Sequence, residues 1–159
     1  MDLWKYYDGD LKYPDLTKHS RKKEIAKATP KWAYSYTKKN GKNKDLEPII
    51  AKSSKYSYLY AYEVLESRFE LGEPVIAKDV ELSCDYAINV LIGPFKLGEK
   101  AISKYSDLSF EYARNALKGP FPLGEPSLAK NDYFAREYTQ NILKKDFVLD
   151  GKLICKYEG

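Results

Sequence analysis

The sequence predicts an all-α fold, a helical-repeat solenoid, because one short pattern returns every 26 residues. A Leu-Gly-Glu triplet begins at Leu71, Leu97 and Leu123, and a phenylalanine stands two residues before each of them. Between the triplets, apolar residues recur three and four positions apart, which is the spacing of one face of an α-helix. A fixed period of roughly 20–50 residues is typical of arrays whose units bury their apolar faces only by stacking.

Length and composition suit a single domain with a buried core. The chain has 159 residues, of which 43% are hydrophobic and 31% are charged. No stretch approaches the roughly 18 consecutive apolar residues of a membrane span, and the first residues lack the basic-then-apolar order of a secretory signal. Two cysteines, Cys84 and Cys155, do not make a disulfide framework. We therefore expect a cytoplasmic protein that does not associate with a membrane.

The charge is unevenly distributed and divides the chain in two. The net charge is +4; residues 1–46 hold 12 Lys/Arg against 6 Asp/Glu, whereas residues 47–159 hold 15 against 17. We interpret residues 1–46 as a basic N-terminal cap that contains a degenerate repeat. Residues 47–159 are interpreted as one continuous solenoid of four 26-residue repeats and a truncated fifth. A basic segment raises the expectation of an acidic partner.

In the N-terminal cap, the apolar and aromatic residues from Ile25 to Tyr36 fit a repeat unit whose register has slipped by one. Residues 38–44 have the polar, Gly/Asn-bearing composition of a loop. Residues 1–20 combine turn residues with aromatic side chains. We expect them to be ordered and to shield the first apolar face, because terminal repeats usually need such a cap.

Each complete unit is predicted to contain a short helix, a turn, a longer helix and a Phe-x-Leu-Gly loop. Proline stands second in three units, where its fixed φ opens a helix at little cost. Side-chain oxygens at or next to four positions are expected to cap the longer helices: Ser54, Asp79, Ser106 and Asp132. Gly93-Pro94 and Gly119-Pro120 should end two of these helices, with the glycine in the left-handed conformation. The truncated unit at residues 151–159 should form only its short helix.

Two aromatic columns are predicted to lie inside the array. The tyrosines fall on the apolar stripe of the longer helices, and we expect their hydroxyl groups to bond to a neighbouring unit: Tyr60, Tyr86, Tyr112 and Tyr138. Base stacking on these rings would instead require the stripe to face outwards. The loop phenylalanines should be buried and should fasten adjacent units: Phe69, Phe95, Phe121 and Phe147. Cys155 occupies a column of small residues and is expected to be packed in the interior.

A lysine recurs at one position of all five units: Lys52, Lys78, Lys104, Lys130 and Lys156. In a stack with helices about 8–10 Å apart, these lysines would form a line of positive charge along one edge. Such a line could contact an acidic partner or a phosphate backbone. Alternatively, each lysine caps the C-terminus of its short helix or pairs with Glu73, Glu99 or Glu125. A charged residue at a repeated position most often caps a helix or pairs with a neighbouring charge, so we favour the alternative.

An asparagine recurs three residues after the tyrosine in three of the longer helices: Asn89, Asn115 and Asn141. Asparagine has a low helix propensity, so its side chain is expected to bond to a specific partner. We expect this partner to be the backbone of an adjoining loop. A second row of contacts for a ligand is the alternative.

The segments Asp85–Phe95 and Leu123–Lys130 resemble a short helical repeat of proteins from tailed phages and giant viruses. In those proteins a Tyr-Ala helix, a Gly-centred stop and a Glu-Pro restart recur many times. The resemblance covers roughly residues 47–158. It implies a viral gene product that acts inside an infected cell, and it carries over no catalytic residues. The sequence departs from the pattern at Lys100 and Lys152, which replace proline, and in the first and fourth units, which lack the Gly-Pro stop.

No residues form a catalytic or metal-binding pattern. His19 is the only histidine, no Cys/His cluster has ligand spacing, and spacing alone does not distinguish paired catalytic carboxylates from surface glutamates. We therefore expect no cofactor and no enzyme activity, and a hydrolase or transferase is the least favoured class.

We interpret the chain as a binding protein that engages a host protein, with an inhibited defence factor as one candidate target. Helical stacks present extended surfaces that suit this role. The alternative is a nucleic-acid-binding protein that holds phosphates with the lysine column and with the basic residues Arg21, Lys22 and Lys23. The nearly neutral array argues against this alternative.

Overall fold

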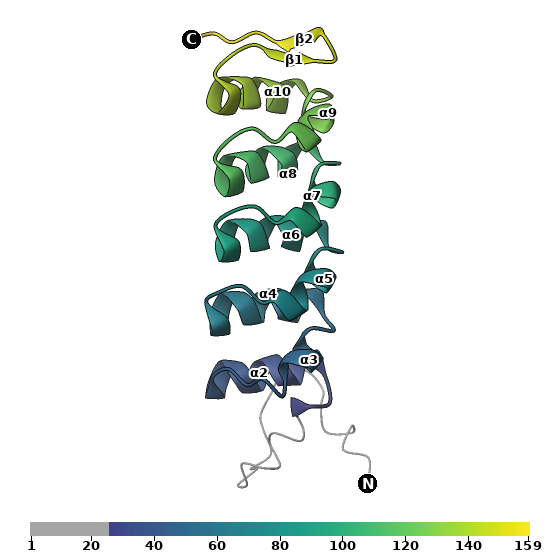
Figure 1. The fold of residues 1–159 in the computed structure, drawn as a ribbon, viewed down its shortest axis with the longest axis vertical. Coiled ribbons are helices and arrows are strands. Elements are labelled where there is room, and N and C mark those ends of the chain that lie inside the picture. The colour runs from purple at the N-terminus through teal and green to yellow at the C-terminus, as the bar shows by residue number, and fades with distance from the viewer. Residues whose placement is uncertain (1–25) are drawn as a thin grey trace.

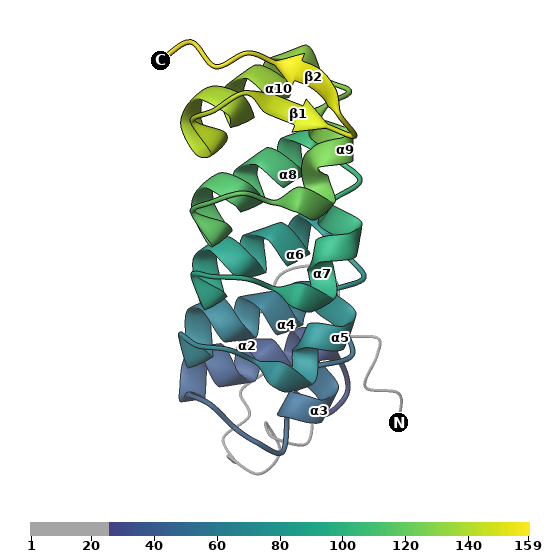
Figure 2. The ribbon, with the colours of Figure 1, turned by 45° about the horizontal axis from the view of Figure 1, so that its top comes forward.

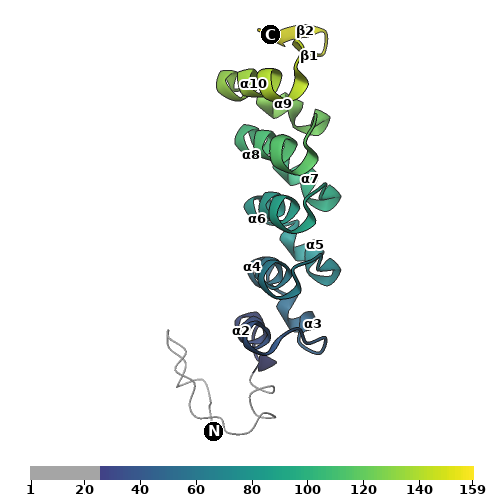
Figure 3. The same cartoon turned by 90° about the vertical axis from the view of Figure 1, so that its left-hand side faces the viewer.

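The computed structural model describes residues 26–159, and Figure 1 shows them as a column of helices stacked along one axis. The longer helices form one layer, and the short helices lie along one side of that layer (Figure 3). The expected helical class is confirmed in this general form, although the C-terminal end is a two-stranded sheet. No helix in this part of the chain is long and apolar enough to cross a membrane.

Each of four successive units contributes one short and one longer helix. The short helices are α3 (Glu47–Ile50), α5 (Glu73–Ile76), α7 (Lys96–Ile102) and α9 (Glu125–Leu128), and 3-10 turns at Glu70–Gly72 and Pro122–Gly124 lead into α5 and α9. The longer helices begin as α4 (Ser54–Tyr60), α6 (Val80–Tyr86), α8 (Ser106–Glu111) and α10 (Asp132–Tyr138). Each continues in the wider π-helical form, over Ala61–Leu65, Ala87–Leu91, Tyr112–Leu117 and Thr139–Leu143.

Side chains cap three of the four longer helices. Asp79 caps α6 as predicted, because its Oδ1 accepts a 3.1 Å hydrogen bond from the backbone N–H three residues later. The caps of α4 and α10 are Ser53 and Asn131, one residue before the expected positions. In the third unit Ser106 does not cap the helix, but the carboxylate of the next residue, Asp107, accepts a 2.9 Å bond from the following backbone N–H in the first turn. Tyr105 occupies the N-cap position of α8, and neither it nor Ser106 accepts a capping bond.

A left-handed residue ends each longer helix, but it is not the predicted glycine. Ile92 has φ 48° and ψ 44°, and Lys118 has φ 52°, whereas φ is not positive at Gly93 or Gly119. The reason is the widened last turn, in which the Gly93 N–H reaches back six residues to the carbonyl of Ala87 at 3.1 Å. The equivalent left-handed residues of the first and fourth units are Glu66 and Lys144.

Helix α2 (Pro30–Asn40) packs against α3 and α4 as a shifted repeat. Thr29 caps α2 in the way that Ser53 caps α4, and the two caps are 24 residues apart. The slip relative to the 26-residue period is therefore two residues, not the predicted one. Part of the slip arises because α2 has no π-helical turn. Lys38 and Lys39 belong to α2, so the predicted loop begins later, at Gly41. The expected cap at residues 1–20 lies outside the described residues.

Three of the four buried tyrosines of the column join two units. The Tyr112 hydroxyl accepts a 2.8 Å hydrogen bond from the backbone N–H of Phe95 and donates a 2.9 Å bond to Glu99. Its ring packs edge-on against Phe121, with ring centroids 4.9 Å apart. Tyr86 and Tyr138 repeat these three contacts. The predicted burial of both aromatic columns is confirmed. The predicted bonding between units is confirmed for these three tyrosines, whereas the Tyr60 hydroxyl donates a 3.0 Å bond to Glu47 of its own unit.

Gly98 allows the short helix α7 to approach the longer helix α6 closely. A Cβ atom at Gly98 would lie 2.7 Å from Ser83 Cβ and 2.8 Å from Phe95 Cδ1, which is too close for real atoms. The Ser83 hydroxyl in turn donates a 3.1 Å hydrogen bond to the carbonyl of Ile76. The glycine of the triplet is therefore required for close packing between units and not for a positive φ. Gly72 and Gly124 are in equivalent positions.

The C-terminal end forms a β-hairpin instead of the predicted short helix (Figure 2). β1 (Phe147–Leu149) pairs antiparallel with β2 (Lys152–Cys155). Asp150 and Gly151 have φ values of 50° and 76°, as a two-residue Asp-Gly hairpin turn requires. Asp150 stands in the column of the triplet glycines, so the close helix contact cannot repeat here. Cys155 is consequently half-buried in a strand rather than packed in the interior.

Candidate binding surface

The leucine of each Leu-Gly-Glu triplet has no evident part in the internal packing, unlike its two neighbours in the triplet. The glycine fits against the preceding longer helix, and the glutamate accepts a bond from the buried tyrosine. In contrast, the leucines are 52%, 58% and 51% exposed; they are Leu71, Leu97 and Leu123. These leucines mark the repeat in the sequence but are not among the predicted binding residues. The feature that could have indicated them as binding residues is the presence of leucine at three equivalent positions.

The leucines and the lysine column share the outer side of the short helices. In the second unit Leu71, Pro74 and Lys78 are exposed, whereas Glu73 and Ile76 between them are buried. Positions three and seven residues apart lie on the same side of a helical segment. We call this surface the outer short-helix face. In the three interior units it comprises Leu71, Pro74, Lys78, Leu97, Lys100, Lys104, Leu123, Pro126 and Lys130.

All five lysines of the column are exposed. None of their ammonium groups forms a hydrogen bond or an ion pair with any residue of the described range 26–159. Lys52, Lys78, Lys104 and Lys130 follow successive short helices, whereas Lys156 follows β2 and is not equivalent to them.

The predicted pairing of these lysines with the triplet glutamates is wrong. Glu73 is 3% exposed and binds Arg68 at 2.7 Å and the Tyr86 hydroxyl at 3.2 Å. Glu99 pairs with Lys96 at 3.1 Å. The tyrosine column draws these carboxylates inwards, so they do not reach the lysine column.

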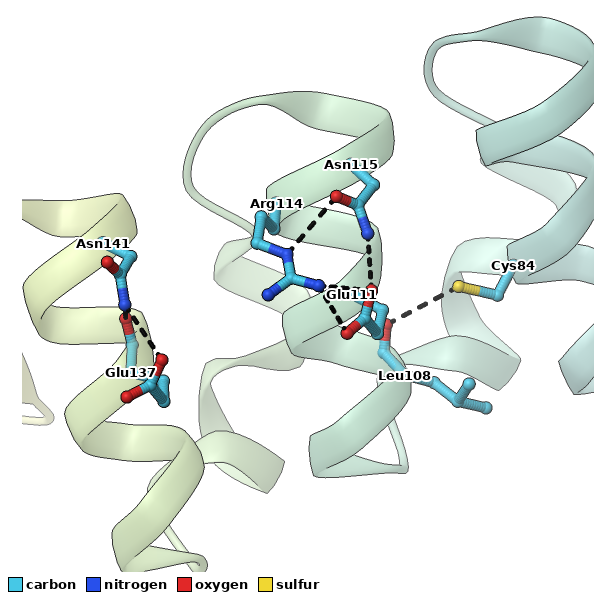
Figure 4. Close-up of polar contacts among 7 residues, drawn as sticks. All are labelled: Cys84, Leu108, Glu111, Arg114, Asn115, Glu137 and Asn141. Atoms are coloured by element: carbon cyan, nitrogen blue, oxygen red, sulfur yellow. Dashed lines mark hydrogen bonds and ion pairs between the residues drawn. The ribbon is translucent and has the colours of Figure 1, made fainter.

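The asparagine column does not bond to a loop backbone, and that expectation is also wrong. Asn89 Nδ2 donates to the Tyr58 hydroxyl of the preceding unit at 3.3 Å. Asn115 and Asn141 donate to a glutamate four residues earlier in their own helices, as Figure 4 shows. For Asn141 the bonds to the backbone carbonyl and the carboxylate of Glu137 are both 3.0 Å long. Their amide groups are thus engaged within the longer-helix layer.

The surface of the longer helices is acidic around α6. Burial, with the nearby charges of Glu81 and Asp79, raises the pKa of Asp85 above its usual value. The thiol of Cys84 lies beneath this surface, with its Sγ 3.8 Å from the carbonyl of Leu108 (Figure 4). Burial raises the pKa of Cys84 to about 12. Because the thiolate is the reactive form, Cys84 is not an activated nucleophile.

Arg21, Lys22 and Lys23, the basic residues assigned to the N-terminal arm, lie outside the described residues. Within residues 26–159, no three His, Cys, Asp or Glu side chains are grouped to hold a metal ion. Every buried side-chain nitrogen or oxygen in this range has a hydrogen-bond partner.

Comparison of the chain with protein-family models, curated proteins and solved structures gives no match. Functional inference therefore depends on the chain's own surface.

Proposed function

We propose that this chain is a non-enzymatic helical-repeat solenoid that binds a protein partner in the cytoplasm. The observation that supports this function is the outer short-helix face, where exposed leucines and unpaired lysines return in successive units. Neither residue type has a partner in the described part of the chain that would account for its repetition. Extended surfaces of this kind are what helical stacks use in binding.

The resemblance of residues 47–158 to phage and giant-virus repeats supports a viral origin and a host protein as the partner. A host defence factor inhibited by the chain is one such target.

Affinity capture from host-cell lysate tests the proposal if surface variants are compared in parallel. The full chain should retain one protein at near-equal stoichiometry, and the triple variant Lys78→Glu, Lys104→Glu, Lys130→Glu should lose it. The matched control is Lys55→Glu, Lys118→Glu, Lys144→Glu, which reverses one exposed lysine within a longer helix and two directly after longer helices. The absence of any captured protein would contradict the proposal. Equal capture by both triple variants would show that the partner binds elsewhere than on the outer short-helix face.

Nucleic-acid binding is the second candidate, favoured by the ammonium groups of the lysine column, which have no partner among residues 26–159. Fluorescence anisotropy with duplex DNA and with RNA at about 50 mM salt, where phosphate contacts are strongest, tests it. If phosphates are held, the log–log salt slope on duplex DNA should fall by about 0.9 for each contact removed. No binding under these conditions eliminates this candidate.

A further inference from the structure

We infer that the outer short-helix face binds an acidic amphipathic α-helix whose apolar side chains recur every seven residues. This inference deepens the proposed protein-binding function and rests on it. Three independent features of the face support it: its apolar column, its charge and its spacing.

The apolar column is the first feature. The leucine side chains are more than half exposed at three equivalent positions, and a regular line of such residues is uncommon where no partner covers it. Leu71 also borders an open hollow of about 620 Å³, lined in part by Leu65 and Phe69. Leucine offers no flat ring on which a base could stack, so the column favours a protein over a nucleic acid.

The charge of the face is the second feature. The ammonium groups of Lys78, Lys100, Lys104 and Lys130 are exposed and have no partner in the described residues. The carboxylates of the same segments are turned inwards, because Tyr86, Tyr112 and Tyr138 bind them. Glu70 is the exposed exception, and it lies 3.9 Å from Arg68. The face is therefore positive beside the leucines, and its complement is acidic.

The spacing of the units is the third feature. Stacked helices lie about 8–10 Å apart, so equivalent leucines are separated by about this distance. An α-helix advances about 10.5 Å in seven residues. By contrast, same-face residues of a strand repeat after about 6.6 Å. A helix with apolar residues at i, i+7 and i+14 thus matches the three leucines, with acidic residues beside them to meet the lysines.

Selection from a displayed library of random 18-residue peptides tests the inference, with the tagged full chain as bait. Enriched peptides should be acidic, with Leu, Ile or Phe seven residues apart. Their synthetic versions should bind in fluorescence polarisation and become helical on binding. Affinity should fall at least tenfold in the triple variant Leu71→Ser, Leu97→Ser, Leu123→Ser. The triple variant Lys78→Glu, Lys104→Glu, Lys130→Glu should also bind the peptide at least tenfold more weakly.

The matched control is Val148→Ser with Leu153→Ser, which removes an exposed apolar pair of the hairpin and should leave affinity unchanged. Circular dichroism confirms that each variant is folded. If a triple variant unfolds, the single changes Leu97→Ser and Lys104→Glu replace it, each with an expected loss of at least threefold.

Several outcomes would overturn the inference: enrichment of basic or uncharged peptides, enrichment of none, or equal weakening by the control. Displacement of the peptide by duplex DNA at physiological salt would identify the face as a phosphate surface instead. If lysate capture succeeds but depends on neither the leucines nor the lysines, the inference fails while protein binding stands. If nothing is captured from the library or from the lysate, both fail.

Discussion

The Tyr112 hydroxyl donates a 2.9 Å hydrogen bond to the carboxylate of Glu99, thirteen residues earlier. This bond ties the start of a short helix to the longer helix of the same unit. Because the same oxygen accepts a bond from Phe95 N, it also holds the preceding loop. One phenolic group therefore satisfies a buried backbone donor and positions a carboxylate.

The Tyr112→Phe variant should be less stable by about 1–3 kcal/mol, because the buried N–H of Phe95 would lose its acceptor. The free energy of unfolding from urea denaturation measures this loss. Tyr133→Phe is the control, since Tyr133 is 65% exposed and its hydroxyl should contribute less than about 0.5 kcal/mol. Equal stabilities of the two variants would show that the inter-unit bond is dispensable.

Stability should fall above pH 10, because burial and Glu47 raise the pKa of Tyr60 from 10.0 to about 12. The folded chain keeps a proton that the unfolded chain loses. This contribution is therefore complete below pH 10 and disappears as the pH rises towards 12. Burial raises the pKa values of Tyr86, Tyr112 and Tyr138 in the same direction. The urea midpoint, measured with tyrosinate absorbance, should decline across this range. Tyr60→Phe should reduce the decline, and a flat profile would contradict the assignment.

Two glycine-to-alanine changes should have opposite consequences. Gly98→Ala should cost about 1–3 kcal/mol, because its Cβ would lie 2.7 Å from Ser83 Cβ. Gly93→Ala should be neutral or stabilising by up to about 1 kcal/mol, since the nearest atom is Leu91 O at 3.6 Å. Thermal denaturation of both variants measures the difference. A larger loss at Gly93 would restore that glycine as the conformational stop.

The Ile92→Asn variant should be more stable by about 1 kcal/mol. Ile92 is left-handed and 68% exposed, and a β-branched residue is strained there, whereas asparagine tolerates this conformation. Ile92→Val keeps the branched side chain and should show no such gain. A loss of stability on Ile92→Asn would mean that the isoleucine makes packing contacts that outweigh its strain.

The helical class and the buried columns could be predicted from the sequence because apolar residues recur at helical spacing within each 26-residue period. The equivalents of Tyr86 and Phe95 are large aromatic residues that recur beside an apolar helical stripe, and this combination predicts burial. The period alone does not, because the columns of Leu71 and Lys78 recur equally and are exposed. The helix ends could not be placed as reliably. The Gly93-Pro94 pair suggests a glycine stop, but the π-helical turn shifts the left-handed residue to Ile92.

The candidate surface was only partly predictable. The exposure of a charged side chain depends on which neighbouring residue forms a hydrogen bond or an ion pair with it. Lysine–glutamate pairing was plausible from spacing, yet Tyr86 and Arg68 hold Glu73 inside. The exposed Leu71 could not be distinguished from a buried loop leucine until its surroundings were known. Asp150-Gly151 is a familiar hairpin signal, but the repeat register favoured a helix at the same place.

Because Tyr86, Tyr112 and Tyr138 contact the loop of the preceding unit in the same way, the stack of helices can lose or gain a whole unit. Residues 95–120 begin after one Gly-Pro pair and end with the next, so their removal would join Pro94 to Phe121 and recreate the Gly-Pro-Phe sequence at the junction. Tyr138 would still bind the N–H of Phe121, and Phe121 would meet Tyr86 in place of Tyr112. The tyrosine contacts with the loops would keep their form, while α6 would pack against α10 in place of α8, and the column would be one unit shorter. Duplication of the same block would add a unit, so the length of the column and of its exposed side can change in steps of 26 residues.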